Sequence, residues 1–562
     1  MHQYSFVLPF FRRIVLLTVV FSLHLGLLAQ SSPFEKASAN GAIAAIGFER
    51  CDRYANDWLS YADPETKLLP RNLYHEVGLW NANDCAADNF PFMVLTSFFT
   101  NQQNYNGVMR QILTNERKLT ARVRSLPDDY SFTKRAFVYD KADMGRVVFG
   151  TAEYCKDGLM PITEWLGKTP WSERMLELLN DLNNEIDVAD AKKLHYSETL
   201  NTEINGELIQ VLSRVYWMTG DKKFLDWALQ IGDHFLLGED YPLKSMTNLR
   251  LRDHGCELLS GLCELYATLH YVDKNKKELY RKPLYDLLDY VLQYGRNEDG
   301  LFYNAINPQT NQVLDKGLAD CWGYNLNGYY TVYMIDSTAR YKDAVVKVLN
   351  NINKEKYHSY NWENGSQDGY ADAIESAINL YNRVPIPAAA EWIDSQIKVM
   401  WSLQDSVISR FPIDSNVRKD WLQPGTGVIE GWYGDGNFAR TSIMYNLWKS
   451  KGTYLQPWKP DVELGAEMKG DSLFVSLTSS SSDWSGKLYF DKVRHKAIMK
   501  MPIDWPRINQ FPEWYTIDPK RKYKLLNEKG KLLRNVTGSD LLNGIEANTQ
   551  KGSFNRMILV GL

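Results

Sequence analysis

The chain has 562 residues, of which 44% are hydrophobic and 23% are charged, a balance typical of globular proteins. Its formal net charge of −4, with no basic stripe, argues against a protein that binds nucleic acid. The length allows two or three domains, or one large helical toroid with an appendage. The aromatic content is high, with 33 Tyr, 17 Trp and 22 Phe. Exposed rings suit the C–H faces of sugars, although most single rings pack in cores.

Residues 1–30 have the pattern of an export signal. Arg12 and Arg13 end a positively charged segment, residues 14–28 are apolar, and Ala29 supplies a small residue before a cleavage site. The apolar stretch is short for a stable membrane span, and no Cys follows it to carry a lipid anchor. We therefore expect a periplasmic or secreted protein that has no membrane segment after cleavage.

Between about residues 36 and 450 the apolar residues recur at helical spacing, with no convincing strand among them. The predicted helices are 36–61, 104–123, 138–156, 171–187, 198–219, 222–238, 254–272, 276–296, 321–337, 341–353, 366–382, 386–403 and 433–449. From residue 460 apolar and polar residues alternate, as in strands. We predict a helical domain over 31–455 and a small β-sandwich-like domain over 460–562.

Polar and aromatic clusters stand at or just before every second predicted helix, roughly 50–65 residues apart. They are WNANDCAADNFPF (80–92), TKRAFVYDKADMGR (133–146), LNTEINGE (200–207), RDHGCE (252–257), ADCWGYNLNGYY (319–330), SQDGYADAIE (366–375) and EGWYGDGNFAR (430–440). Six or seven helical hairpins in a ring would bring these helix starts to one face, where they would line a single cavity. The fold we predict is mainly α, an (α/α)6-type toroid. The alternative is a set of unrelated helix caps.

No metal or cofactor is predicted. The six cysteines are too few for a disulfide scaffold in a chain of this length, and neither CxxC nor HExxH occurs. Runs such as NANDCAADN offer oxygen ligands that suit calcium, but they lack the spacing of a recognisable calcium loop. The cysteines are therefore expected to be buried small hydrophobic residues.

The segments DHGCELLSGLCELY (253–266), ADCWGYNLNGYY (319–330) and DWPRINQFPEWYTID (504–518) resemble those of (α/α)-toroid enzymes of bacterial polysaccharide degradation. The helical part looks like unsaturated glucuronyl hydrolases and uronate lyases, and the combination of segments looks most like the oligosaccharide dehydratases of ulvan-degradation loci. The resemblance implies an anionic oligosaccharide as substrate and elimination at C4 of a terminal uronic acid. It covers nearly the whole chain after residue 30.

Elimination at a uronate needs a base for the C5 proton, an acid for the group that leaves C4, and a cation or strong donor on the carboxylate. We expect His254 to be the base, oriented by Glu257 one helical turn later. Tyr324 is the candidate acid, while Arg252 and Arg440 are candidate carboxylate clamps. His75 is a second candidate base. For each of these residues a structural role is the alternative.

Further residues of the clusters are candidates for binding the sugar. The stacking candidates are Trp80, Trp322 and Trp432, and the polar candidates are Asp88, Asp320, Asn325 and Asp435. A glycoside hydrolase would instead use two carboxylates, for which Asp88, Asp253, Asp320 and Asp435 are available. A non-catalytic glycan-binding protein would need the aromatic residues alone. The sequence does not predict the oligomeric state.

Overall fold

The computed structural model describes residues 32–562 except 186–197, 359 and 408–409, together with the side chains of all these residues except 198–201 and His254. The predicted export signal therefore lies outside the described residues. Within them, no helix is both long enough and apolar enough to cross a membrane.

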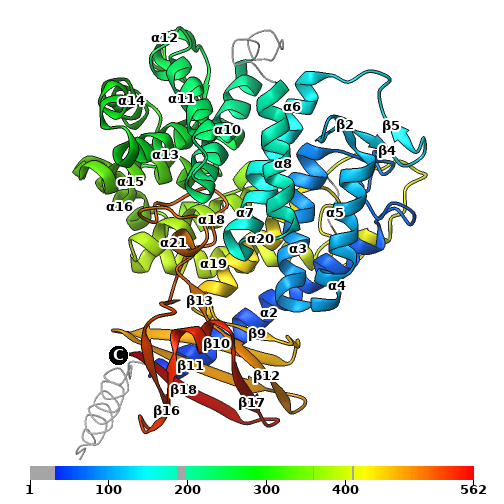
Figure 1. The fold of residues 1–562 in the computed structure, drawn as a ribbon, viewed down its shortest axis with the longest axis vertical. Helices are drawn as coiled ribbons and strands as arrows, with labels where there is room; N and C mark the ends of the chain where they lie inside the picture. The colour runs from blue at the N-terminus through cyan, green and yellow to red at the C-terminus, as the bar shows by residue number, and fades with distance from the viewer. Residues whose placement is uncertain (1–31, 186–197, 359, 408–409) are drawn as a thin grey trace, which may run out of the picture.

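The larger part of the chain is a ring of helices in two layers (Figure 1). The inner layer holds η1 (Ala82–Asn89) with α3 (Phe90–Thr100), α6 (Met144–Glu153) with η2 (Tyr154–Leu159) and α7 (Met160–Leu166), α10 (Glu198–Thr219), α13 (Cys256–Val272), α15 (Trp322–Asp336), α18 (Gln367–Arg383) and α20 (Gly434–Lys449). Each inner segment packs on the next, and α20 closes the ring against η1 and α3. The outer layer holds α2 (Pro33–Ser60), α5 (Val108–Leu119), α8 (Pro170–Glu185), α11 (Lys222–Leu236), α14 (Lys274–Tyr294), α16 (Ala339–Asn351) and α19 (Pro387–Gln404).

The prediction of a helical toroid is confirmed, and the described part of the chain forms seven helical pairs, within the expected six or seven but one more than the (α/α)6 type. The periodicity did not reveal the inner helix α3. The sequence of α3, FPFMVLTSFFT, contains only apolar and small polar residues, so the helix has no polar face, as expected for a buried helix.

The two layers differ in burial, as their sequences require. In the outer helix α11, Asp221 caps the N-terminus, and the buried side chains Phe224, Ala228, Ile231 and Phe235 form one stripe toward the inner layer. All residues of the inner helix α20 are buried. A polar side chain on an inner helix is therefore costly to bury unless it is paired or faces a central cavity.

The helical part also contains short strands, contrary to the prediction of none before residue 460. The longest are β7 (Tyr303–Asn307) and β8 (Gln312–Leu318), a hairpin that pairs with β6 (Leu249–Arg250) just before α13. Five strands of two or three residues lie between α2 and α6: β1 (Leu79–Trp80), β2 (Ala121–Val123), β3 (Leu126–Pro127), β4 (Tyr130–Ser131) and β5 (Ala136–Phe137).

The C-terminal part contains two antiparallel sheets that share one apolar core. One has the order β10-β11-β18-β15-β16 and the other β17-β12-β9. The strands are β9 (Tyr454–Gln456), β10 (Val462–Lys469), β11 (Ser472–Ser479), β12 (Trp484–Tyr489), β15 (Lys522–Asn527), β16 (Leu532–Thr537), β17 (Ile545–Thr549) and β18 (Phe554–Gly561). Leu477 and Leu559 of the first sheet and Leu488 of the second are fully buried in this core.

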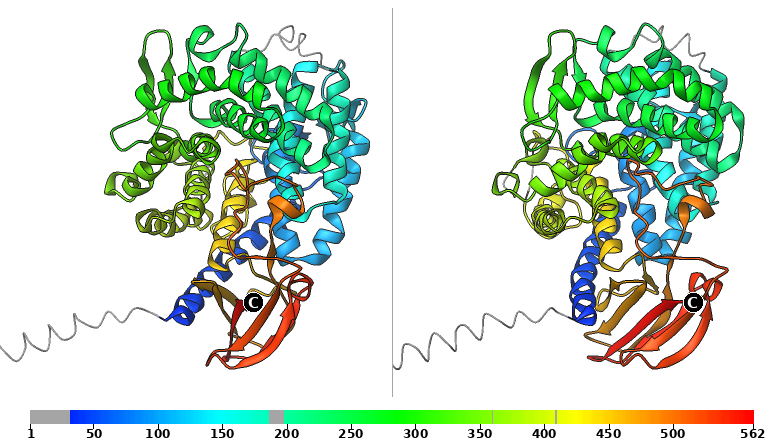
Figure 2. Two further views of the ribbon diagram at one scale, coloured as in Figure 1. Left: turned by 60° about the vertical axis from the view of Figure 1, so that its left-hand side comes forward. Right: turned by 90° about the vertical axis from the view of Figure 1, so that its left-hand side faces the viewer.

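The helical part and the C-terminal part exchange segments across the predicted boundary between residues 455 and 460. The N-terminal half of α2 lies on β10 and β11, and its other half packs on α3 and α20 (Figure 2). In the opposite direction, residues 493–515 leave the sheets and reach into the ring. This segment joins β13 (Asp491–Lys492) to β14 (Thr516–Ile517) and includes the short helix α21 (Arg494–Ala497).

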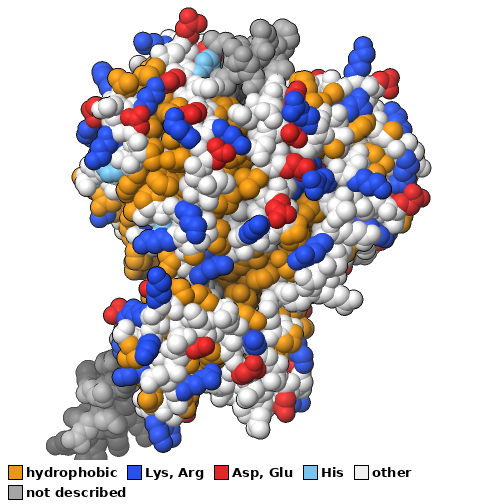
Figure 3. All heavy atoms as spheres, viewed as in Figure 1, with side chains coloured by type: hydrophobic (Ala, Val, Ile, Leu, Met, Phe, Trp, Pro, Cys, Tyr) orange, Lys and Arg blue, Asp and Glu red, His pale blue; other side chains and the backbone are white. Residues whose placement is uncertain are grey.

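Figure 3 shows acidic and basic side chains interspersed over one face of the ring.

Candidate active site

A cavity of about 150 Å³ opens where the inner helices begin. Five of the seven predicted clusters contribute to its lining, and two residues come from the inserted segment 493–515. The lining residues are Asp88, Asp157, Asp253, Glu257, Tyr324, Glu363, Asp368, Asp372, Tyr433, Asn437, Arg440, Ile508 and Asn509. Most of these lining side chains are carboxylates, and Arg440 is the one arginine among them.

The backbone around the cavity departs from regular helix at several points. Asp88 lies in η1 and Asp157 in η2, and these two π-helical segments pack against each other. Asp253 and Glu363 have positive φ angles of 48° and 43°. Non-glycine residues in this region and π-helical turns both cost conformational energy, and both concentrate at functional sites.

Tyr324 and Arg440 belong to one buried network. The Tyr324 hydroxyl donates to Asp372 Oδ1 or Glu375 Oε2, each at 3.0 Å. The guanidinium of Arg440 lies 2.5 Å from Asp372 Oδ1 and 2.7 Å from Glu375 Oε2, and it donates to Asn437 Oδ1 at 2.9 Å. Burial raises the pKa of Tyr324 well above its ordinary value despite the nearby Arg440. At neutral pH Tyr324 is therefore a neutral donor, and Arg440 already has two carboxylate partners.

Asp368 stands one helical turn before Asp372 on α18. Burial and the negative charges of Asp372, Glu363 and Asp88 raise the pKa of Asp368 well above its ordinary value. Its Oδ1 accepts a hydrogen bond of 2.7 Å from the Asn437 side-chain amide. The surroundings of Asp368 thus favour a protonated carboxylic acid, whereas Asp372 is ion-paired with Arg440.

The opposite wall of the cavity is held by Lys156. Its ammonium group donates to Asp157 Oδ1 at 2.7 Å and to Glu257 Oε1 at 2.6 Å. Glu257 also accepts a hydrogen bond from the side-chain amide of Gln210. The Asn509 amide of the inserted segment donates to the same Asp157 oxygen at 2.5 Å. Glu257 therefore belongs to a buried ion-pair network.

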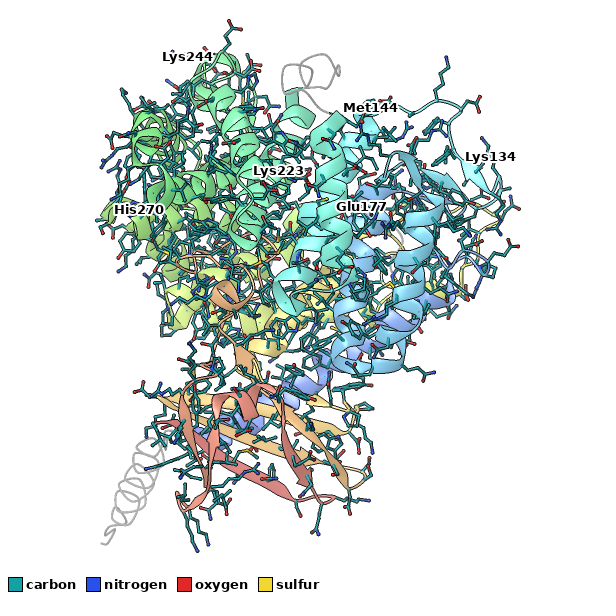
Figure 4. All side chains as sticks on the ribbon, in the orientation of Figure 1. Lys134, Met144, Glu177, Lys223, Lys244 and His270 are labelled. Carbon is teal, nitrogen blue, oxygen red and sulfur yellow. The ribbon has the colours of Figure 1, made fainter. Side chains whose placement is uncertain are left out.

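The remaining predicted catalytic residues are placed as follows. The backbone of His254 lies in the turn η3 (Asp253–Gly255), but its side chain lies outside the described residues. Arg252 does not line the cavity, and its charge acts on Asp315 of β8. His75 is largely exposed beside Glu76. Another histidine, His270, lies at the outer edge of the ring next to Lys277 (Figure 4).

The stacking role predicted for three tryptophans does not fit their positions. Trp80 and Trp322 are fully buried, so neither presents a ring face to a sugar. Trp432 is half-buried, donates to Glu430 at 2.7 Å and packs on Tyr433 with the ring centroids 4.3 Å apart. The aromatic side chain that reaches the cavity from this pair is Tyr433.

Two of the predicted polar binding residues, Asp435 and Asn325, have structural roles in this arrangement, and a third, Asp320, lies outside the lining of the cavity. Asp435 is fully buried and accepts hydrogen bonds from Trp58 and from three backbone N–H groups of residues 429–431. Asn325 donates to the Leu251 carbonyl at 2.7 Å. Asp320 does not line the cavity, although burial and the charges of nearby carboxylates raise its pKa to about 8. Asp88 does line the cavity.

Several lining residues were not among the predicted site residues. Some of them lie within the clusters given above: Asp368, Asp372 and Asn437. What marks these residues in the sequence is that they are polar and stand at the start of a helix whose other residues are mostly apolar and buried. Asp157 follows a predicted helix in the run YCKDGL, where two charges stand among buried residues. Asn509 lies in DWPRINQFPEWYTID, whose insertion depends on contacts hundreds of residues away.

Comparisons with known proteins give structural matches only; no family model and no curated protein matches the chain. An α-1,6-mannanase from Salegentibacter sp. HEL1_6 matches at 12% identity and TM-score 0.37, over 52% of this chain and 89% of that one. Cellobiose 2-epimerase from Bacillus thermoamylovorans B4167 matches at 12% identity and TM-score 0.37, over 71% of this chain and 98% of that one. An unsaturated glucuronyl hydrolase variant with the tetrasaccharide dGlcA-Glc-Rha-Glc matches at 11% identity and TM-score 0.35, over 55% of this chain and 87% of that one. At these values the matches assign no function to this chain.

Proposed function

We propose that this chain is a carbohydrate-active enzyme that hydrolyses a glycosidic bond in the cavity at the helix starts. The observation that carries the proposal is Asp368 of α18, a carboxyl group whose pKa is raised by burial and by the charges of Asp372, Glu363 and Asp88, in a cavity lined by further carboxylates. A protonated carboxylic acid beside other carboxyl groups is the equipment of acid–base catalysis.

In this mechanism Asp368 gives its proton to the glycosidic oxygen of the leaving group. Asp88 and Asp253, which line the same cavity, are the candidates for the second carboxylate, which activates water or attacks the anomeric carbon. Tyr433 offers an aromatic face to the sugar, and the amides of Asn437 and Asn509 offer hydrogen bonds to its hydroxyls. Asp372 and Arg440 keep the negative charge beside Asp368 in place.

The second candidate is elimination of water or sugar at C4 of a terminal uronate, in oligosaccharides of the ulvan type. Tyr324 favours it as a neutral proton donor in the cavity, and the amides of Asn437 and Asn509 are the donors available for the substrate carboxylate. Two features disfavour it. Arg440 is already bound to two carboxylates, and the acidic lining repels an anionic ligand.

The test is incubation of the chain lacking residues 1–30 with neutral and uronate-terminated oligosaccharides, followed by mass spectrometry and ultraviolet absorbance. Hydrolysis adds one water per bond broken and leaves absorbance flat. Elimination raises absorbance, because it creates a conjugated unsaturated uronate, and would replace the first proposal with the second. Binding of sugars without any product would contradict both and indicate a glycan-binding protein.

The matched variant is Asp368→Asn, which keeps the size of the side chain and its bond with Asn437 but removes the acidic proton. We expect kcat to fall by about 10²- to 10⁴-fold, with unchanged thermal unfolding and retained sugar binding. Asp471→Asn, at an exposed turn between β10 and β11, is the control and should behave as the wild type. Full activity of Asp368→Asn would remove Asp368 from the mechanism.

A further inference from the structure

Behind the Lys156 wall of the cavity, three buried carboxylates converge. Glu153 ends α6, Asp157 lies in η2, and Glu207 lies in α10. One oxygen from each lies within 4.8 Å of the others, and the three residues are 3%, 7% and 0% exposed. Carboxylates that approach so closely without water repel one another unless something positive lies among them.

Glu207 is the residue that most clearly lacks a positively charged or hydrogen-bonding partner. It is fully buried, it points toward the other two carboxylates, and neither of its carboxylate oxygens has a hydrogen-bond partner. Burial, together with the charges of Asp157 and Glu203, raises its pKa well above the ordinary value. A buried polar group without any partner is rare in folded proteins and points to an absent ligand or proton.

Lys156 does not supply the missing charge. Its ammonium group is bound to Asp157 Oδ1 and to Glu257, which is a fourth carboxylate. The amide of Asn509 donates to the same Asp157 oxygen, so the hydrogen bonds on Asp157 end on Oδ1 and leave Oδ2 for another partner. A single ammonium therefore faces Asp157, Glu207 and Glu257 at once.

We propose that Glu153, Asp157 and Glu207 bind one divalent cation, Ca²⁺, that joins α6 and η2 to α10. Two oxygens 4.8 Å apart, the upper limit within this group, can both lie about 2.4 Å from one ion, the usual Ca²⁺–oxygen distance. The donors are oxygens alone, which disfavours Zn²⁺. All three residues are buried, which disfavours Mg²⁺, because Mg²⁺ keeps several of its waters. This proposal departs from the sequence-based expectation of no metal.

The cation would act on the cavity through Asp157, which lines the cavity and binds both Lys156 and Asn509. Neutralising this side of the ring would fix the position of Lys156 and lower the repulsion among the carboxylates around it. The inference stands independently of the reaction proposed above, since its evidence is the burial and convergence of three carboxylates and the missing partners of Glu207.

The experiment uses the full chain after residue 30, stripped with EDTA and dialysed. We expect calorimetric titration with CaCl₂ to give one site per chain, and Ca²⁺ to raise the thermal unfolding midpoint more than the same concentration of MgCl₂ or ZnCl₂ does. Elemental analysis of protein purified without chelator should show about one calcium per chain. Glu207→Gln should weaken binding at least about tenfold, because it removes one ligand charge.

The control is Glu513→Gln, in a second group of acidic and histidine side chains made by His495, Asp504 and Glu513. There Asp504 is already paired with Arg383 and Arg507, so this variant should leave calcium binding unchanged. If Glu207→Gln does not fold, Glu153→Gln replaces it as the ligand variant, and the calcium titration of the wild type still tests whether the site binds the ion. A wild type that binds no calcium and shows no shift of the unfolding midpoint would overturn the proposal and indicate shared protons among the carboxylates.

Discussion

Asp368 and Asp372 show how one turn of helix can place two carboxyl groups in different surroundings. Both face the same cavity, but Asp372 lies 2.5 Å from the guanidinium of Arg440, whereas Asp368 meets an amide and other carboxylates that, together with burial, raise its pKa. A nearby cation favours the ionised form of a carboxyl group, and burial beside like charges favours the protonated form. The position of Arg440, one turn beyond Asn437 on α20, therefore determines which of the two is the candidate acid.

Carboxyl groups with raised pKa values also make a prediction about stability. The pKa of Asp320 is raised to about 8, and those of Glu375 and Glu430 to about 7, in each case mainly by burial. Between their unfolded and folded pKa values the folded chain holds more protons than the unfolded chain. Their stabilisation is thus complete below about pH 4 and is lost as pH rises through 7 and 8.

We therefore expect the free energy of unfolding to fall as pH rises from 5 to 9, by up to about 1.4 kcal/mol per pH unit for each proton involved. Asp320→Asn should flatten the upper part of this curve, because an amide has no proton to lose, while its oxygen still accepts from Cys321. Urea unfolding of both proteins across the pH range measures the effect. Parallel curves for the two proteins would contradict the raised pKa of Asp320.

At the scale of elements, the sequence predicted what depends on local periodicity. Outer helices such as α11 carry an apolar stripe, and their positions could be predicted closely. The helix α3 has no polar face and was not predicted, although the polar cluster in η1 just before it was identified. The stacking role of Trp80 and Trp322 was misjudged because a cluster at a helix start contains both cavity residues and core residues, and only packing separates them.

The inserted segment 493–515 was beyond local inference. It is held by buried pairs with distant partners: Arg507 with Glu164, and the indole of Trp505 with Glu264 at 3.2 Å. The backbone carbonyl of Ile508 also accepts from Arg214 at 3.2 Å. No pattern within the segment shows these partners. The charged residues among aromatic ones in DWPRINQFPEWYTID were the available signal that it is not a surface loop.

Asn509 tests whether the inserted segment serves the site or only fills the ring. Its φ is +60°, a conformation that glycine adopts freely. Asn509→Gly therefore keeps the backbone conformation and the backbone N–H bond to Glu375, but it removes the side-chain amide that donates to Asp157. We expect kcat/KM for the oligosaccharide substrate to fall about tenfold, with a small change in the unfolding midpoint. Lys500→Gly is the control, because Lys500 has φ +58° in the same segment and is exposed. Equal effects of the two variants would assign the segment a structural role only.

At the scale of the whole molecule, α2 is the connection between the sheets and the ring. Its first residues are fixed by a capping box of Ser32 and Glu35, and its path crosses β10 before it joins the ring. The crossing depends on two glycines that meet backbone to backbone. A Cβ on Gly465 would lie 2.1 Å from the Ala37 carbonyl oxygen and 2.2 Å from the Gly41 nitrogen.

The close approach predicts that sheets and ring unfold as one unit. Gly465→Ala must push α2 away from β10, since the atoms in the way belong to backbone and have no rotamer to change; we expect a loss of about 1–3 kcal/mol or more. Circular dichroism would follow the helices during heating, while hydrogen exchange of the β11 and β18 amides, read by mass spectrometry, would report the strands of the sheet core. In the wild type the two signals should change together, and in Gly465→Ala both midpoints should fall. Lys469→Ala, at the exposed end of β10, should change neither. If the strands of Gly465→Ala melted alone while the ring kept its midpoint, α2 would not be the element that couples the two parts.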